Sequence, residues 1–185
     1  MRDANELDPR AVGELLQELR LRLIHRGVNG QLRVVGGAAL ALHFPDDPDV
    51  RVTKDIDALY WPKSAVDEVV REIAVERGLP VDWLNDRARP WAPRDADRGA
   101  VASFTVGNAS LEEMVAMKLS ASREQDLHDL EILARHMNIT AADALVQIAY
   151  DQYGEDSMAL TESREEYLLI AQQVLDSVRR GRRQR

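Results

Sequence analysis

The sequence has no cysteine among its 185 residues, which excludes disulfide bonds and zinc sites built from thiolates. It also has no long apolar segment: the longest, from Val34 to Phe44, includes a Gly-Gly pair and is too short to span a membrane. Residues 1–6 lack the apolar core of a signal peptide. These absences predict a cytoplasmic protein without membrane contacts.

An excess of positive charge is absent as well, because the formal net charge is −8 at pH 7. Such an acidic balance argues against broad affinity for nucleic acids. The exception is the segment 179–185, which contains Arg179, Arg180, Arg182, Arg183 and Arg185. These arginines could contact RNA phosphates. The simpler interpretation is a solvated, disordered tail, because chain ends fray unless other contacts hold them.

The spacing of apolar residues divides the chain into a strand-rich part and a helical part. Helical periodicity and capping signals predict helices over residues 9–26, from the Gly-Gly turn to 43, and over 64–78, 110–119, 124–137, 140–153 and 162–179. Short apolar runs predict strands over 31–35, 53–60, 79–84 and 100–106, with a loop over 85–99. This order predicts an α+β fold, with a small mixed sheet flanked by helices in residues 1–107 and a helical region in 108–185.

The stretch Thr53-Lys54-Asp55-Ile56-Asp57 carries the clearest chemical signal. In a strand, side chains alternate between the two faces, so Asp55 and Asp57 project from one face together with Thr53. Neighbouring carboxylates repel each other unless a cation lies between them. Paired oxygen ligands suit Mg²⁺, which binds one or two carboxylates together with waters and substrate phosphates. The alternative is a pair of surface aspartates on an exposed sheet edge.

Upstream of that stretch, Gly36-Gly37 follows a short apolar run and leads into residues 38–42, which predicts a strand, a tight turn and a helix. Glycine lets backbone N–H groups approach an anion closely, and the N terminus of a helix adds partial positive charge. A phosphate site next to a metal site predicts that a nucleotide binds here.

A third carboxylate would complete a site for two-metal phosphoryl transfer, in which it helps to deprotonate the attacking hydroxyl. Asp82 lies on the predicted strand 79–84 and is the best placed, with Asp86 as the reserve. The alternative role of either aspartate is to cap a turn in a loop.

A second group of charged residues follows in the helical region. Lys118 lies on the helix that begins near Ser110, from where it could reach a triphosphate as a point charge. Arg123, Asp126 and Asp129 are spaced by three, so they share one face if the helix is continuous. The alternative is a solvated face with salt bridges.

Together, the Gly-Gly turn, the motif Thr53-x-Asp55-x-Asp57 and the downstream Lys, Arg and Asp residues resemble the nucleotidyltransferase-like proteins of the AbiEii type, which include the MenT-type toxins of toxin–antitoxin systems. The resemblance implies a polymerase-β-like core, a helical C-terminal region, Mg²⁺ and a nucleoside triphosphate (NTP). Toxins of this branch transfer nucleotides, often pyrimidines, to the 3′ end of tRNA, and an antitoxin restrains them. The resemblance therefore implies tRNA and an antitoxin protein as partners.

Carried over to matching positions, the resemblance implies that Asp55 and Asp57 hold Mg²⁺, that Gly36 and Gly37 cradle phosphate, and that Lys118 binds the triphosphate. Two alternatives remain open. The same fold could bind a nucleotide or a protein without turnover, or it could transfer the nucleotide to a protein or a small molecule.

The resemblance also implies roles for the remaining motif residues. Asp126 and Asp129 would order the site or assist the acceptor. Thr53 and Arg123 would join the residues that bind the nucleotide.

Overall fold

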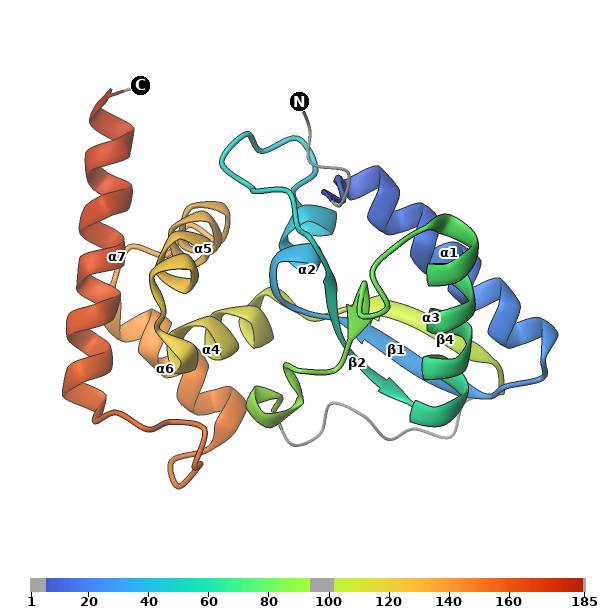
Figure 1. Cartoon of the computed structure of the whole chain (residues 1–185). Coiled ribbons are helices and arrows are strands. Elements are labelled where there is room, and N and C mark those ends of the chain that lie inside the picture. The colour runs from blue at the N-terminus through green and yellow to red at the C-terminus, as the bar shows by residue number, and fades with distance from the viewer. Residues whose placement is uncertain (1–5, 94–101, 185) are drawn as a thin grey trace. The chain divides into compact units, whose positions relative to one another are not determined.

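The computed structural model describes residues 6–93 and 102–184, and its contacts divide the chain into two compact units (Figure 1). The first, here called the core unit, comprises residues 1–89 and 95–109. The second, here called the helical unit, comprises residues 90–94 and 110–185.

The core unit is built on a mixed sheet of four strands in the order β3-β2-β1-β4. These are β1 (Gly30–Val34), β2 (Ile56–Trp61), β3 (Leu84–Asn85) and β4 (Phe104–Asn108). β1 pairs antiparallel with β2 and parallel with β4, and β2 pairs parallel with β3. The predicted α+β class with a small mixed sheet is confirmed.

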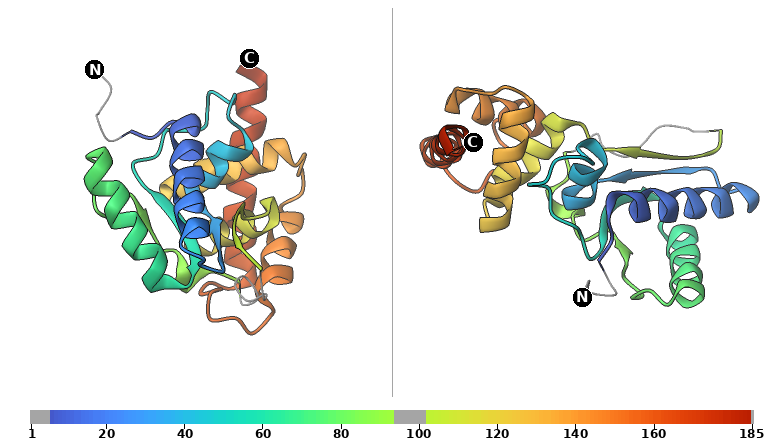
Figure 2. Two further views of the ribbon diagram at one scale, coloured as in Figure 1. Left: turned by 90° about the vertical axis from the view of Figure 1, so that its right-hand side faces the viewer. Right: turned by 90° about the horizontal axis from the view of Figure 1, so that it is seen from above.

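Three helices pack with this sheet: α1 (Pro9–His25), α2 (Gly36–His43) and α3 (Lys63–Arg77). α1 and α3 lie side by side on one face (Figure 2). That face carries the buried side chains of Leu32, Val34, Ile56 and Ala58. Because successive side chains on a strand point to opposite faces, Asp57 and its ladder neighbour Asn85 belong to the other face.

The ends of these helices follow from short-range chemistry. Asp8 caps α1, because its carboxylate accepts a hydrogen bond from the Ala11 amide at 2.9 Å. α3 ends at Gly78, which adopts φ +64° and allows its amide to bond the Ala74 carbonyl. The sequence patterns therefore predict these two helices to within a residue or two.

The helical unit contains α4 (Leu111–Ala121), α5 (Glu124–His136), α6 (Ala142–Tyr153) and α7 (Arg164–Gln184), with a short 3₁₀ helix at Arg89–Trp91 at the boundary of the units. Ser110 and Glu113 form the expected capping box of α4. Ser122, in the left-handed conformation, separates α4 from α5.

Several boundaries differ from the predictions. The strand predicted over 53–60 begins only at Ile56 and ends at Trp61, because Thr53 pairs with Leu7 instead. The strand predicted over 79–84 is wrong, because a turn closed by the Trp83 amide and the Pro80 carbonyl occupies it. Only its last residue, Leu84, lies in β3.

Three further predictions on segments outside the carboxylate motif also need correction. Thr140 does not cap α6, whose N-cap position is Ala141. The prediction of a disordered tail is wrong for residues 179–184, because α7 continues to Gln184. The strand predicted over 100–106 corresponds to β4, which begins later, at Phe104, and continues to Asn108. Residues 94–101, which include part of the predicted loop and the start of the predicted strand, lie outside the described residues.

Within residues 6–93 and 102–184, none of the helices combines the length and the apolar character that crossing a membrane requires.

Candidate functional site

The turn between β1 and α2 lies against the carboxylate of Asp57. Gly36 has φ +64°, and a Cβ atom at this position would be 3.3 Å from Asp57 Oδ2. The left-handed backbone and the close approach both favour glycine here. The N-cap residue of α2, Val35, makes no side-chain cap bond, and backbone amides at the N terminus of a helix favour anions.

Thr53 also lies close to this glycine turn. A Cβ atom on Gly37 would be 4.0 Å from Thr53 Oγ1, and this hydroxyl donates a hydrogen bond to the Asp55 carbonyl at 2.6 Å. The backbone of Thr53 is held by a β-bridge to Leu7, in which the Leu7 amide donates to the Thr53 carbonyl at 2.7 Å. The structure thus brings together the glycine turn, Thr53 and the carboxylate motif, although Thr53 is not part of β2.

Asn85 links the two aspartates and was not predicted as a site residue. It lies beside Asp57 in the parallel β2–β3 ladder, and its amide Nδ2 donates to Asp55 Oδ2 at 3.2 Å. Because Asn85 belongs to the same face as Asp57 and bonds Asp55, both carboxylates lie toward that face. The available signal was its place directly after the apolar pair Trp83-Leu84, but the predicted strand stopped one residue too early.

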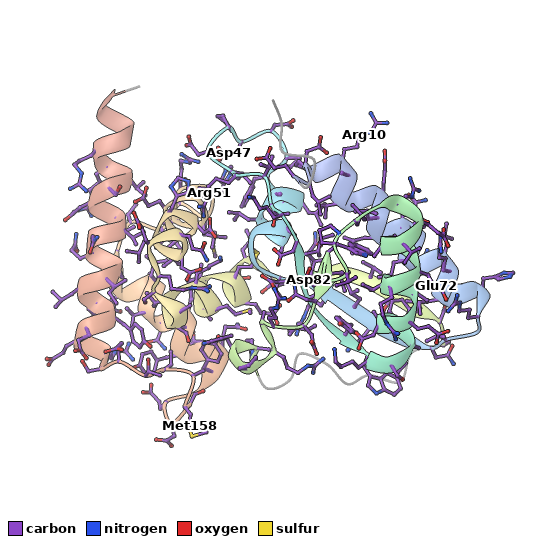
Figure 3. The ribbon with its side chains drawn as sticks, in the orientation of Figure 1. Arg10, Asp47, Arg51, Glu72, Asp82 and Met158 are labelled. Carbon is purple, nitrogen blue, oxygen red and sulfur yellow. The ribbon has the colours of Figure 1, made fainter. Side chains whose placement is uncertain are left out.

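Arg87 is the second residue that sequence reasoning missed. Its guanidinium donates to Asp82 Oδ2 at 2.6 Å, while its other terminal nitrogen is 3.8 Å from Asp55 Oδ2. Asp82, labelled in Figure 3, lies in the turn before β3 and not on a strand. The hydrogen bond from Arg87 lowers the pKa of Asp82. Asp82 and Asp55 are therefore within reach of one shared cation.

Asp86, the reserve for a third carboxylate, belongs to a different group. It binds Lys63 at 3.0 Å and approaches Arg89 at 3.5 Å. Burial alone would raise the pKa of Asp86, but the hydrogen bonds and charges of these two cations lower it. Of the two aspartates, Asp82 is the one that shares a partner with Asp55.

A cavity of about 430 Å³ in the core unit adjoins this group. Its wall includes Asp82 and Asn85, which contact Arg87 and Asp55 respectively, and extends to Lys63 and Asp67 on α3. The volume is in the range of small-molecule sites. The polar groups at the α3 end bind one another, since the Tyr60 hydroxyl donates to Asp67 at 2.7 Å.

The second predicted group assembles in the helical unit. Lys118 Nζ on α4 lies 2.9 Å from Asp126 Oδ1 and 2.6 Å from Asp129 Oδ2, both on α5. Arg123 Nε donates to Asp126 Oδ2 at 2.7 Å. Arg123 occupies the N-cap position of α5, so the condition of a continuous helix does not hold for it. Asp126 and Asp129 both lie on α5 and both bind Lys118.

Burial and charge act in opposite directions on this group, here called the Lys118 cluster. Asp126 is fully buried, and Lys118 and Asp129 are less than a tenth exposed. Burial would lower the pKa of Lys118, but the charges of Asp129 and Asp126 outweigh it and raise the pKa. Burial would raise the pKa of Asp126, but Arg123 and Lys118 lower it. Lys118 is therefore a charged, enclosed ammonium with two carboxylate partners.

The residues of the core unit fit a magnesium ion by their chemistry. Asp55 and Asp57 supply carboxylate oxygen atoms, which are the ligands that Mg²⁺ prefers. In the described part of the chain, no group of three or more His, Cys, Asp or Glu side chains is gathered for a metal. Two carboxylates suffice for Mg²⁺ when waters and substrate phosphates fill the remaining positions.

Comparisons with known proteins add no family assignment. No protein-family model matches the chain, and no curated protein and no solved structure matches it. The core unit itself offers a carboxylate pair, a helix N terminus at a glycine turn, and an arginine between two aspartates.

Proposed function

We propose that this protein is a Mg²⁺-dependent nucleotidyltransferase that moves a nucleoside monophosphate from an NTP to an acceptor hydroxyl. The observation that supports it most is the approach of Asp57 to Gly36, with 3.3 Å between Asp57 Oδ2 and the place of a Cβ atom on the glycine. This approach supports the proposal because a carboxylate can ligate Mg²⁺ and the amides at the start of a helix can bind phosphate.

In this proposal each group of the core unit has a separate task. Asp55 and Asp57 hold Mg²⁺, which supplies charge neutralisation for the phosphates when it is bound. The backbone amides at Gly36 and Gly37 bind phosphate oxygens. Asn85 orients Asp55 through its hydrogen bond of 3.2 Å.

The bond changes of the transfer are defined by this chemistry. The acceptor oxygen forms a bond to the α-phosphorus of the NTP, and the bond from that phosphorus to the bridging oxygen of the β-phosphate breaks. Pyrophosphate leaves with the electron pair of the broken bond, and the hydroxyl proton passes to Asp82. Asp82 is the proposed proton acceptor because its side chain is 49% exposed and is linked to Asp55 through Arg87.

The acceptor in this proposal is the 3′ end of tRNA, with a pyrimidine nucleotide as the donor and a toxin activity that an antitoxin protein restrains. These assignments rest on the resemblance of the glycine, aspartate and lysine motifs. In the same way, Lys118, Asp126, Arg123 and Asp129 remain proposed contributors to nucleotide binding and ordering, and the proposal for the core unit does not depend on them.

The test is incubation of the protein with each α-labelled NTP, Mg²⁺ and total RNA, followed by separation of RNA and protein on a denaturing gel. Label in the tRNA band that is lost in Asp57→Asn would support the transfer to tRNA. Glu14→Gln is the matched control, because Glu14 is an exposed carboxylate on α1 that forms an ion pair with Arg10, one helical turn away. Equal loss of label in this control would contradict a specific role of Asp57.

A binding module without turnover is the second candidate, and one observation favours it. Asp55 already receives a hydrogen bond from Asn85 and faces Arg87 at 3.8 Å, so its charge is partly balanced by the protein itself. Under this alternative, NTP binds in the presence of Mg²⁺ but no label reaches RNA, protein or a small molecule. Label in protein would instead indicate a protein acceptor.

A further inference from the structure

Arg87 connects the carboxylate pair with the turn that carries Asp82. One terminal nitrogen of its guanidinium lies 2.6 Å from Asp82 Oδ2, and the other lies 3.8 Å from Asp55 Oδ2. Its backbone amide donates to Asn85 Oδ1 at 3.0 Å. The main chain of Arg87 is thus fixed to the end of β3, while its side chain, which is 65% exposed, can adopt other rotamers at low cost.

The charges around this guanidinium explain its position. Asp82 and Asp55 both approach Arg87, and a cation between two carboxylates reduces their repulsion. The hydrogen bond and charge of Asp82 raise the pKa of Arg87 most, and the charges of Asp55 and Asp57 add to this. A divalent cation bound to Asp55 and Asp57 would neutralise these two carboxylates, so the attraction between Arg87 and Asp55 would weaken. The ion pair with Asp82 would remain, but both of its side chains are exposed, and such pairs are weak. A phosphate of higher charge can therefore compete with Asp82 for the guanidinium.

We propose that Arg87 is the counter-ion of the carboxylate pair in the metal-free protein, and that metal binding releases its guanidinium to bind a phosphate of the incoming NTP. This inference rests on the proposed function. It assigns Arg87 as a substrate-binding residue. A guanidinium suits that role because its planar fork binds phosphate oxygens through two parallel hydrogen bonds.

If Arg87 had only a structural role, its removal would change the stability of the protein and not its affinity for ligands. Its partners Asp82 and Asp55 are 49% and 39% exposed in their side chains, so water can solvate both carboxylates when the arginine is removed. Exposed ion pairs contribute little to the free energy of unfolding. The variant Arg87→Gln should therefore fold and melt like the wild type, and its ligand binding can be measured directly.

The experiment titrates metal-free protein with Mn²⁺ alone, by calorimetry or by the electron paramagnetic resonance signal of free Mn²⁺. Arg87→Gln should bind Mn²⁺ about threefold more tightly than the wild type, the size expected for removal of an exposed competing cation. At saturating Mn²⁺, the same variant should bind a non-hydrolysable NTP about tenfold more weakly, because a charge-assisted bidentate contact is lost. Arg87→Lys should restore the wild-type metal affinity and only part of the NTP affinity.

Arg10→Gln is the matched control, because Arg10 is an exposed arginine on α1 whose ion pair with Glu14 is 2.9 Å long (Figure 3). It should change neither affinity. Equal Mn²⁺ affinities of the wild type and Arg87→Gln would overturn the counter-ion role, and equal NTP affinities would overturn the phosphate role. If the wild type bound no Mn²⁺, the metal site of the proposed function would be wrong as well. If the wild type bound Mn²⁺ but Arg87→Gln changed neither affinity, only the role of Arg87 would be wrong.

Discussion

Asp57 and Gly36 are in close approach: Asp57 Oδ2 is 3.3 Å from the point where a Cβ atom would stand on Gly36. The contact joins residues of β2 and the first turn of α2, which are far apart in the sequence. It fixes the carboxylate at the position where the helix amides begin. The positive φ favours glycine here, and a side chain would also press on the Asp57 carboxylate.

The first prediction concerns this glycine. Gly36→Ala should lower the free energy of unfolding by about 1–2 kcal/mol, because alanine is strained at φ +64°. The contact with Asp57 adds to that cost, since 3.3 Å is a tight distance for a Cβ atom. Urea denaturation monitored by circular dichroism measures the difference.

Two other glycines separate the causes. Gly78 also has φ +64° but has open space around it, so Gly78→Ala reports the backbone strain alone. Gly13 lies within α1 with open space and no such strain, so Gly13→Ala should stabilise the protein by about 0.5–1 kcal/mol. A loss in Gly36→Ala no larger than in Gly78→Ala would show that Asp57 does not press on this site.

The second prediction concerns Asp57→Asn. Without metal, this variant should melt within about 2 °C of the wild type or above it, because a like charge is removed next to Asp55. With Mn²⁺ at about 100 times its dissociation constant, the wild type should gain about 5 °C or more, and the variant should gain little. Differential scanning fluorimetry with and without metal tests both statements. A large drop without metal would indicate that Asp57 is structural.

The third prediction concerns the Lys118 cluster. Lys118→Met leaves the buried carboxylates of Asp126 and Asp129 without their ammonium partner, so the variant should lose about 3–5 kcal/mol of the free energy of unfolding. Arg10→Met removes a cation from an exposed pair, with side chains 88% and 65% exposed, and should cost less than about 1 kcal/mol. Similar losses in the two variants, measured by urea denaturation, would contradict the buried character of the cluster.

The fourth prediction concerns pH. The pKa of Asp126 is lowered on folding, so its contribution to stability is complete above the ordinary aspartate value of about 3.9 and is lost as the pH falls below it. The pKa of Lys118 is raised, so its contribution is complete below the ordinary lysine value of about 10.4 and is lost as the pH rises further. The Lys118 cluster should therefore make its full contribution to the free energy of unfolding between about pH 4 and 10.

Denaturation at several pH values checks this window. Lys118→Met should show a flatter alkaline limb than the wild type, because the titrating ammonium is gone. An alkaline limb of unchanged steepness would show that other groups cause the loss of stability at high pH.

The sequence predicts much of this fold because its signals act over short distances. Asp8 before Pro9 marks the start of α1, and Gly78 marks the end of α3, since capping and left-handed conformations depend on a few neighbouring residues. The short strand β3 was misplaced because it forms by pairing with β2, and a two-residue strand carries no periodicity of its own. Asn85 was missed for this reason.

The sequence by itself determined the glycine turn, the alternating aspartates and the caps of the helices, because each depends on the order of neighbouring residues. Only the tertiary structure decided that Asp57 approaches Gly36, that Arg87 lies between Asp82 and Asp55, and that Lys118 is enclosed by two carboxylates. These relationships join segments through strand pairing and burial, and the free energy of such contacts depends on distances that no local pattern encodes.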